Sequence, residues 1–145
     1  MPDLIQLLDE HGNRIPSPEW DRWIEDLDSS VLAYRYVDMV VLRHIDSEAT
    51  ALERQGEIAL WPPVLGQEAA QIGSGRALRQ DDFVFGSYRE TGVAYTRGID
   101  PVAIARVWRG AAASAWDPFE FNMATSQVII GAQSLHATGY ALALQ

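Results

Sequence analysis

The sequence predicts an α/β fold of which this chain supplies a mostly helical part. Three observations lead to this prediction. A long segment after residue 30 repeats apolar residues at helical spacing, the second half alternates short apolar runs with helices, and the chain finishes in a helix rich in Ala and Gly. Such a helix normally packs against a sheet, yet at most two or three short strand candidates precede it. Either the protein is mostly helical, or the sequence is the N-terminal piece of a longer polypeptide.

The first half is predicted to contain a peripheral arm followed by a long helix. Residues 1–30 form the arm, with a short extended segment or hairpin around the turn at His11-Gly12-Asn13. Asp28-Ser29-Ser30 offers N-cap side chains for a helix that ends at Gly56. The apolar stripe of this helix consists of Val31, Tyr34, Val37, Val41, Ile45, Ala49 and Leu52, and charges including Asp38 and Asp46 lie between its members.

Shorter helices are predicted in the second half. Small residues dominate residues 66–75, so a helix there should pack closely against a neighbour. Further helices are expected over residues 87–98 and 101–110. Residues 111–125 read as irregular, and the small-residue helix then runs to Gln145.

Composition excludes several classes of function. The chain has 145 residues and a net charge of −9, from 20 acidic residues and 11 basic ones that are all Arg. Clustered positive charge is what holds nucleic acid, so a nucleic-acid partner is not expected. Without Cys there is no disulfide, thiolate metal site or cysteine nucleophile. No apolar run reaches the roughly 18 to 20 residues of a membrane span, and the start Met-Pro-Asp-Leu has no basic region, so we expect a cytoplasmic protein without membrane contact.

The acidic charge is concentrated at one end of the chain. Residues 1–30 hold eight acidic side chains and two Arg, whereas residues 83–145 hold four of each. A phosphate-bearing ligand is therefore expected in the second half, held by Arg, backbone N–H groups or a metal ion.

Few residues carry a chemical signal of their own. Tyr88 and Arg89 stand at a predicted helix start, where they either bind phosphate or serve packing and a surface ion pair with Glu90. The run Val128-Ile129-Ile130 is either a buried strand end or a loop that presents backbone to a cofactor. Asp81-Asp82 is predicted to form a turn rather than a catalytic carboxylate pair. No metal site and no catalytic residue are assigned, because the three His residues lack partners at ligand spacing.

A collinear set of motifs resembles a known family. The sequence resembles the alpha subunit of the thiamine-diphosphate-dependent E1 component of 2-oxo acid dehydrogenase complexes, and most closely that of pyruvate dehydrogenase. The motifs are residues 54–58, 60–61, 65–75, 82–85, 88–90, 97–101, 116–118, 130–133 and 135–139. The resemblance implies the N-terminal, mostly helical portion of a thiamine-diphosphate-binding fold, with residues 31–145 as an incomplete diphosphate-binding domain.

The resemblance also implies roles for individual residues. Tyr88 and Arg89 match the pair that contacts the cofactor diphosphate. Val128 and Ile130 match positions that line the middle of the cofactor, where Ile130 props the bent shape that brings the amino nitrogen next to the thiazolium carbon. Trp61 matches a position near the substrate entrance.

Function and partners follow by resemblance. The complete enzyme is expected to decarboxylate pyruvate and pass the acetyl unit to a lipoyl group of the E2 core, with an E1 beta subunit completing an α2β2 heterotetramer. Gln127 and Ala132 stand where branched-chain enzymes carry hydroxyl residues for a potassium ion, which favours pyruvate. The Mg²⁺ ligands are expected beyond Gln145, so this chain alone is predicted to be inactive. The alternatives are a branched-chain 2-oxo acid dehydrogenase alpha subunit and a non-catalytic helical module that binds a partner.

Overall fold

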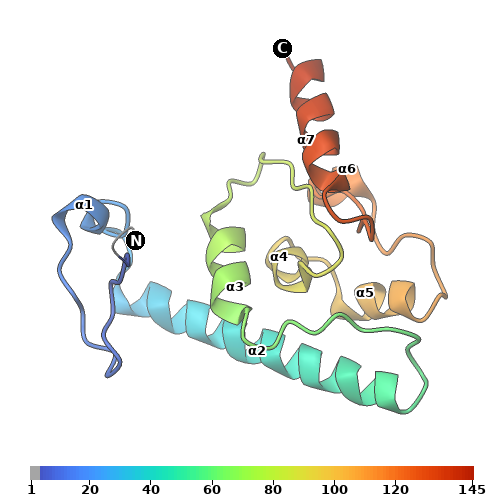
Figure 1. Ribbon diagram of the computed structural model, residues 1–145, viewed down its shortest axis with the longest axis horizontal. Coiled ribbons are helices and arrows are strands. Elements are labelled where there is room, and N and C mark those ends of the chain that lie inside the picture. Colours follow the sequence, from blue (N-terminus) through green and yellow to red (C-terminus); the bar gives the residue numbers. More distant parts are fainter. Residues whose placement is uncertain (1–3) are drawn as a thin grey trace. The chain divides into compact units, whose positions relative to one another are not determined.

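A computed structural model describes residues 4–145, which form helices joined by irregular segments (Figure 1). They divide into two compact units, one ending at Tyr34 and the other beginning at Arg35. The first three residues of the predicted N-terminal arm lie outside the described residues. Among residues 4–145 no helix is long and apolar enough to cross a membrane.

The first unit contains the predicted hairpin. An isolated antiparallel bridge pairs Leu8 with Arg14, and the Asp9 carboxylate accepts backbone N–H groups from His11 and Asn13 at 2.8 and 2.7 Å. The Asp9 side chain thus supplies acceptors for two turn N–H groups that have no main-chain partner in the short hairpin. A one-turn helix that the sequence did not predict, α1 (Pro18–Asp21), follows it.

The long helix is confirmed, but its buried face differs from the predicted stripe. Helix α2 (Ser29–Arg54) begins where the Asp28 carboxylate accepts the N–H groups of Ser30 and Val31, and Gly56 follows its end at φ +77°. Its buried residues are Asp38, Leu42, Asp46 and Ala49. The predicted buried face was wrong because it included only apolar residues. Asp38 and Asp46 are also buried, since hydrogen-bond donors from other segments meet their carboxylates.

Helices α3 (Glu68–Ala77) and α5 (Pro101–Trp108) confirm two of the shorter helices predicted after residue 65. The helix predicted over residues 87–98 is α4 (Thr91–Thr96), which begins four residues later, so placing Tyr88 and Arg89 at a helix start was wrong. Figure 1 shows α4 between α3 and α5, with which it is in contact. The close packing predicted from small residues is confirmed at Gly75, where an added Cβ would lie 3.2 Å from the Thr96 Cβ of α4. Gly73 of the same helix faces open space.

Buried carboxylates join α3 to α2. Arg76 donates to both oxygens of Asp38, at 2.8 and 3.0 Å, and Arg43 donates to Glu68. Glu68 also accepts the N–H of Gly66 at 2.9 Å. Buried charges are tolerated when they are paired and hydrogen-bonded, as they are here.

Two apolar clusters lie against these helices. The smaller consists of Leu42, Val64 and Ile72, which are at most 1% exposed. The larger is built from residues of α2, α4, α5 and the connecting segments, namely Ala49, Ile58, Trp61, Ala94, Ile99, Ile104 and Met123. The core therefore depends on side chains that follow α2 in sequence and fold back onto it.

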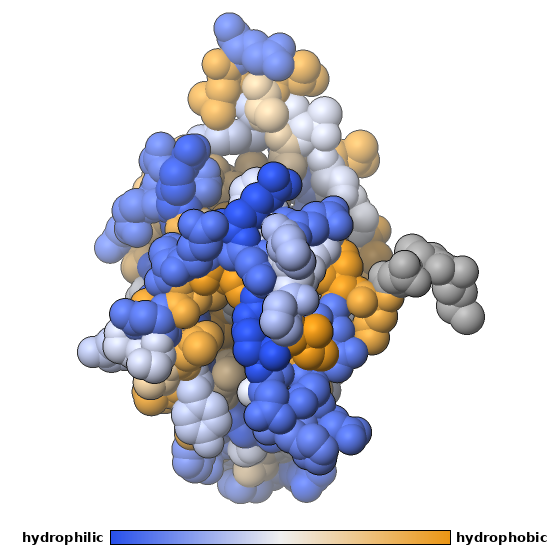
Figure 2. All heavy atoms as spheres, turned by 90° about the vertical axis from the view of Figure 1, so that its left-hand side faces the viewer, coloured by the Kyte–Doolittle hydropathy of each residue, from blue (hydrophilic) through white to orange (hydrophobic). Residues whose placement is uncertain are grey.

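The end of the chain carries little buried surface. Helix α6 (Pro118–Phe121) is a single turn within the stretch predicted as irregular, and α7 (Ala132–Ala143) is the predicted final helix. No residue of α7 is buried, and Leu135 and Leu142 are 77% and 64% exposed. Figure 2 shows apolar and polar side chains together at the top of the view, where α7 ends.

The α/β part of the fold prediction is not seen among the described residues. Between residues 4 and 145 the extended pairings are single bridges, such as the parallel one between Val84 and Met123. The run from Val128 to Ile130 is exposed and irregular, so its interpretation as a buried strand end is wrong. A strand needs neighbours along its length. Among the described residues, Val84 has only this single bridge, and no bridge involves the run from Val128 to Ile130. The mostly helical prediction is confirmed.

The Arg43 to Glu68 pair predicts a pH dependence of stability. The hydrogen bond from Arg43 holds the pKa of Glu68 below its usual value of 4.5. Because the folded pKa is depressed, the unfolded state takes up protons first, so the stabilisation is present above about pH 4.5 and is lost as the pH falls through the folded pKa. We expect the free energy of unfolding to fall less between about pH 5 and pH 3 in Glu68→Gln than in the unsubstituted protein.

Urea unfolding at several pH values measures this difference. Glu10→Gln is the control, because the Glu10 side chain is 86% exposed. If the free energy of unfolding changed equally with pH in Glu68→Gln and in the unsubstituted protein, the prediction would be contradicted.

Candidate functional site

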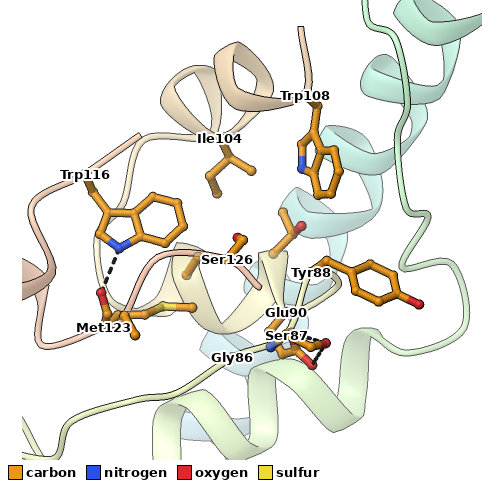
Figure 3. A pocket seen from close by; sticks show the side chains of 12 residues that line it. Gly86, Ser87, Tyr88, Glu90, Ile104, Trp108, Trp116, Met123 and Ser126 are labelled. Atoms are coloured by element: carbon orange, nitrogen blue, oxygen red, sulfur yellow. Dashed lines mark hydrogen bonds between the residues drawn. The ribbon is translucent and has the colours of Figure 1, made fainter. Parts of the chain in front are cut away.

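The Tyr88-Arg89 pair lies in a loop that leads into α4. One oxygen of the Glu90 carboxylate accepts the backbone N–H groups of Ser87 and Arg89, at 2.7 and 3.2 Å, and the Ser87 hydroxyl lies 3.1 Å from both oxygens (Figure 3). These amides are therefore already satisfied within the loop. The Ser87 and Arg89 amides are therefore not free to bind an anion at this place.

Arg89 is held by the segment that precedes α3. Its Nη1 donates to the carbonyl of Pro63 at 2.6 Å, and its guanidinium carbon lies 5.6 Å from the centre of the Tyr88 ring. The predicted surface ion pair with Glu90 does not form: in the part of the chain that the structure describes, no carboxylate lies within 4 Å of the Arg89 guanidinium nitrogens. Its positive charge is thus available to an anionic ligand.

The space behind this loop is packed. A cavity of about 10 Å³, room for one water molecule, lies between the loop and the side chains of Ile104, Trp108 and Trp116. The Trp116 indole N–H donates to the carbonyl of Met123 at 2.8 Å. In Figure 3 the Tyr88 hydroxyl points away from this cavity. The cavity therefore supports the loop and is too small for an organic ligand.

Trp61 is part of the core. It is 2% exposed, and its indole N–H donates to an oxygen of Asp46 at 2.9 Å, the same oxygen that accepts the N–H of Val64 at 2.8 Å. The indole borders an apolar groove of about 390 Å³ between α2 and α5, separate from the small cavity beside Tyr88. The structure does not bring Trp61 into one cavity with Tyr88, and its assignment to the substrate entrance stays a prediction.

Val128 and Ile130 lie on an exposed segment that starts beside the Tyr88 loop. Their exposed fractions are 65% and 79%. The backbone N–H of Gln127 donates to the carbonyl of Ser87 at 2.9 Å. The bond joins the two segments that sequence analysis assigned to the cofactor, although Val128 and Ile130 line neither the cavity nor the groove. Their cofactor contacts stay a prediction.

The comparisons with known proteins identify the family. A family model described as "Dehydrogenase E1 component" matches residues 36–145. This chain belongs to the dehydrogenase E1 component family. The match covers every residue predicted from sequence to contact the cofactor or substrate.

Individual relatives of this E1 chain carry two kinds of name. The 3-methyl-2-oxobutanoate dehydrogenase subunit alpha of Mycobacterium tuberculosis is 42% identical over 141 residues, which is 97% of this chain and 38% of the relative. The pyruvate dehydrogenase E1 component subunit alpha of Staphylococcus aureus is 32% identical over 143 residues, which is 99% of this chain and 38% of the relative. The resemblance to an E1 alpha subunit is confirmed, and this chain spans 38% of the length of these relatives.

The residues that position the site do not follow from the motifs in the sequence. Asp46 holds the segment with Trp61, and the carbonyl of Pro63 holds Arg89. A signal for Asp46 was present, because it lies four residues after Leu42 and three before Ala49, on one helical face. The contact of Arg89 with the Pro63 carbonyl has no signal in the sequence, because every residue carries a main-chain carbonyl.

No cluster of metal ligands is seen in residues 4–145, where no three His, Cys, Asp or Glu side chains are arranged to hold a metal ion.

Replacement of Asp46 tests the link between Trp61 and α2. Asp46→Ala leaves two buried donors without an acceptor, and each unsatisfied group costs about 1–3 kcal/mol, so we expect a loss of about 2–6 kcal/mol in the free energy of unfolding. Asp46→Asn keeps one acceptor oxygen and should lose less. Urea unfolding measures both, with Asp81→Ala as the control because that side chain is 80% exposed. An Asp46→Ala protein as stable as Asp81→Ala would rule out this role.

Proposed function

We propose that this chain forms the diphosphate-binding wall in the alpha subunit of a 2-oxo acid dehydrogenase E1 component. The observation that carries the proposal is the state of Arg89. Its guanidinium is fixed by a main-chain carbonyl but lies near no carboxylate of residues 4–145, and the phenol of Tyr88 lies beside it. A guanidinium held in this way suits a diphosphate, because the planar guanidinium donates charge-assisted hydrogen bonds to phosphate oxygens.

The residues fit one part of thiamine diphosphate, the cofactor on which this family depends. Arg89 and Tyr88 would hold the diphosphate. Val128 and Ile130 offer exposed apolar surface for the middle of the cofactor, on the segment joined to the Tyr88 loop by the Gln127 to Ser87 bond. When bound, the cofactor supplies the electron sink for decarboxylation of a 2-oxo acid.

The remainder of the site belongs to other parts of the proposed enzyme. By the resemblance, the proposed Mg²⁺ ligands would lie beyond Gln145. An E1 beta subunit would complete each active site in an α2β2 heterotetramer, and the acyl group would pass to a lipoyl group of the E2 core. The exposed apolar residues of α7 and of the segment before it are surface on which further protein can pack.

For the substrate we propose a branched 2-oxo acid such as 3-methyl-2-oxobutanoate. The relative bearing this name is 42% identical over 141 residues, against 32% for the relative named for pyruvate. Pyruvate is the second candidate, favoured by Gln127 and Ala132, which lack the hydroxyl groups of a branched-chain potassium site. Those two positions concern a cation rather than the size of the substrate, so we give the identity over the whole chain more weight.

Arg89→Ala tests the diphosphate contact. Loss of a charge-assisted hydrogen bond of about 1.5–3 kcal/mol should raise the Kd for thiamine diphosphate about 10- to 100-fold in a complete alpha subunit purified with its beta subunit. Calorimetry with Mg²⁺ measures the Kd. Arg109→Ala is the matched control, because Arg109 is 62% exposed and pairs with Glu57. Equal Kd values for the two variants would exclude Arg89 from the site.

Steady-state kinetics of the same heterotetramer tests the substrate. We expect a kcat/KM for 3-methyl-2-oxobutanoate about tenfold or more above that for pyruvate, because each missing methylene in an apolar pocket is worth about 1–3 kcal/mol. The reverse order would assign pyruvate. Turnover of neither acid, together with no cofactor binding, would favour the non-catalytic partner-binding module.

A further inference from the structure

The side chain of Gln71 is a buried amide on α3 that faces the start of α4. It is 7% exposed. Its Oε1 accepts the backbone N–H of Gly92 at 2.7 Å, and its Nε2 donates to the backbone carbonyl of Arg89 at 3.0 Å. Nε2 also lies 3.2 Å from the side-chain oxygen of Gln67. One side chain thus bonds the main chain on both sides of Glu90.

The main chain at this place has no room to shift toward α3. A Cβ added at Gly92 would lie 2.6 Å from a methyl carbon of Leu42 and 2.9 Å from the Gln71 Cβ. Gly92 is therefore pressed against both α2 and α3. Because Gly92 is fixed, the hydrogen bond from Gln71 to the Arg89 carbonyl sets the direction of the chain that precedes α4.

We propose that Gln71 is a positioning residue that aims the Tyr88-Arg89 pair at the cofactor diphosphate. This inference rests on the proposed function. Arg89 is held at three places. Its guanidinium donates to Pro63, its N–H donates to Glu90, and its carbonyl accepts from Gln71 and from the N–H of Thr91 at 2.9 Å. Of these, the contact from Gln71 comes from a buried residue of helix α3, so it ties the loop to the core.

The chemistry of the contact requires an amide. The loop presents one acceptor, the Arg89 carbonyl, and one donor, the Gly92 N–H. A glutamine satisfies both, an ionised glutamate satisfies only the donor, and methionine, of similar length, satisfies neither. Preorganisation of this kind lowers the entropy lost when a ligand binds, so its removal weakens binding without removing any group that touches the ligand.

Three variants of α3 separate positioning from stability. Gln71→Met removes both bonds, Gln71→Glu removes only the bond to Arg89, and Ile72→Val is the control, since Ile72 is a neighbouring core residue 1% exposed. The Kd for thiamine diphosphate with Mg²⁺, the Tm and the hydrogen exchange rate of the Gly92 N–H are measured for each in the complete alpha subunit with its beta subunit.

We expect Gln71→Met to raise the Kd about tenfold and to speed exchange at Gly92 about tenfold relative to Ile72→Val, since each lost hydrogen bond is worth up to about a factor of ten. Gln71→Glu should raise the Kd while Gly92 stays protected. A Kd for both Gln71 variants equal to that of Ile72→Val would overturn the inference, even where the unsubstituted protein binds the cofactor normally.

Failure of the proposed function gives a different pattern. If the unsubstituted protein does not bind thiamine diphosphate, the proposed function is overturned together with the role of Gln71 toward a diphosphate. Unchanged exchange at Gly92 in Gln71→Met would instead overturn the positioning contact, whatever the cofactor measurement shows.

Discussion

The interaction on which the rest of the structure depends is the acceptance of two buried donors by Asp46. Its carboxylate binds the Trp61 indole and the Val64 N–H, and so returns the segment after α2 to the middle of that helix. Trp61 and Val64 then enter the two apolar clusters. The same return places the carbonyl of Pro63 where Arg89 binds it. Core and candidate site therefore share one anchor.

The distribution of charge follows the same logic. A chain with a net charge of −9 repels phosphate groups overall. Three of its carboxylates, however, are already hydrogen-bonded to groups of the protein. Glu90 binds loop amides, Glu68 binds Arg43, and Asp38 binds Arg76. Arg89 alone among these residues is held by a main-chain carbonyl, which fixes its position without neutralising its charge. Local pairing, rather than net charge, decides where an anion can bind.

Sequence patterns predicted the helices well because each depends on local signals. The Asp28 cap, Gly56 after α2 and Pro101 at the start of α5 act within one turn of the chain. The buried face of α2 was predicted wrongly. Its aspartates can be buried only because hydrogen-bond donors from residues distant in sequence meet them. For the candidate site, the sequence could name Tyr88 and Arg89. Two of the contacts that orient Arg89, those with Gln71 and Pro63, join residues 18 and 26 positions apart.

By itself the sequence determined the longer helices α2, α3, α5 and α7, the family and the residue types offered to a diphosphate, because capping, periodicity and collinear motifs are properties of neighbouring residues. Only the tertiary structure decided that Asp46 is buried, that Trp61 belongs to the core and that Gln71 bonds both sides of Glu90. The physical reason is that a buried polar group is stable only where a partner of matching hydrogen-bond character meets it, and such a partner comes from another part of the fold.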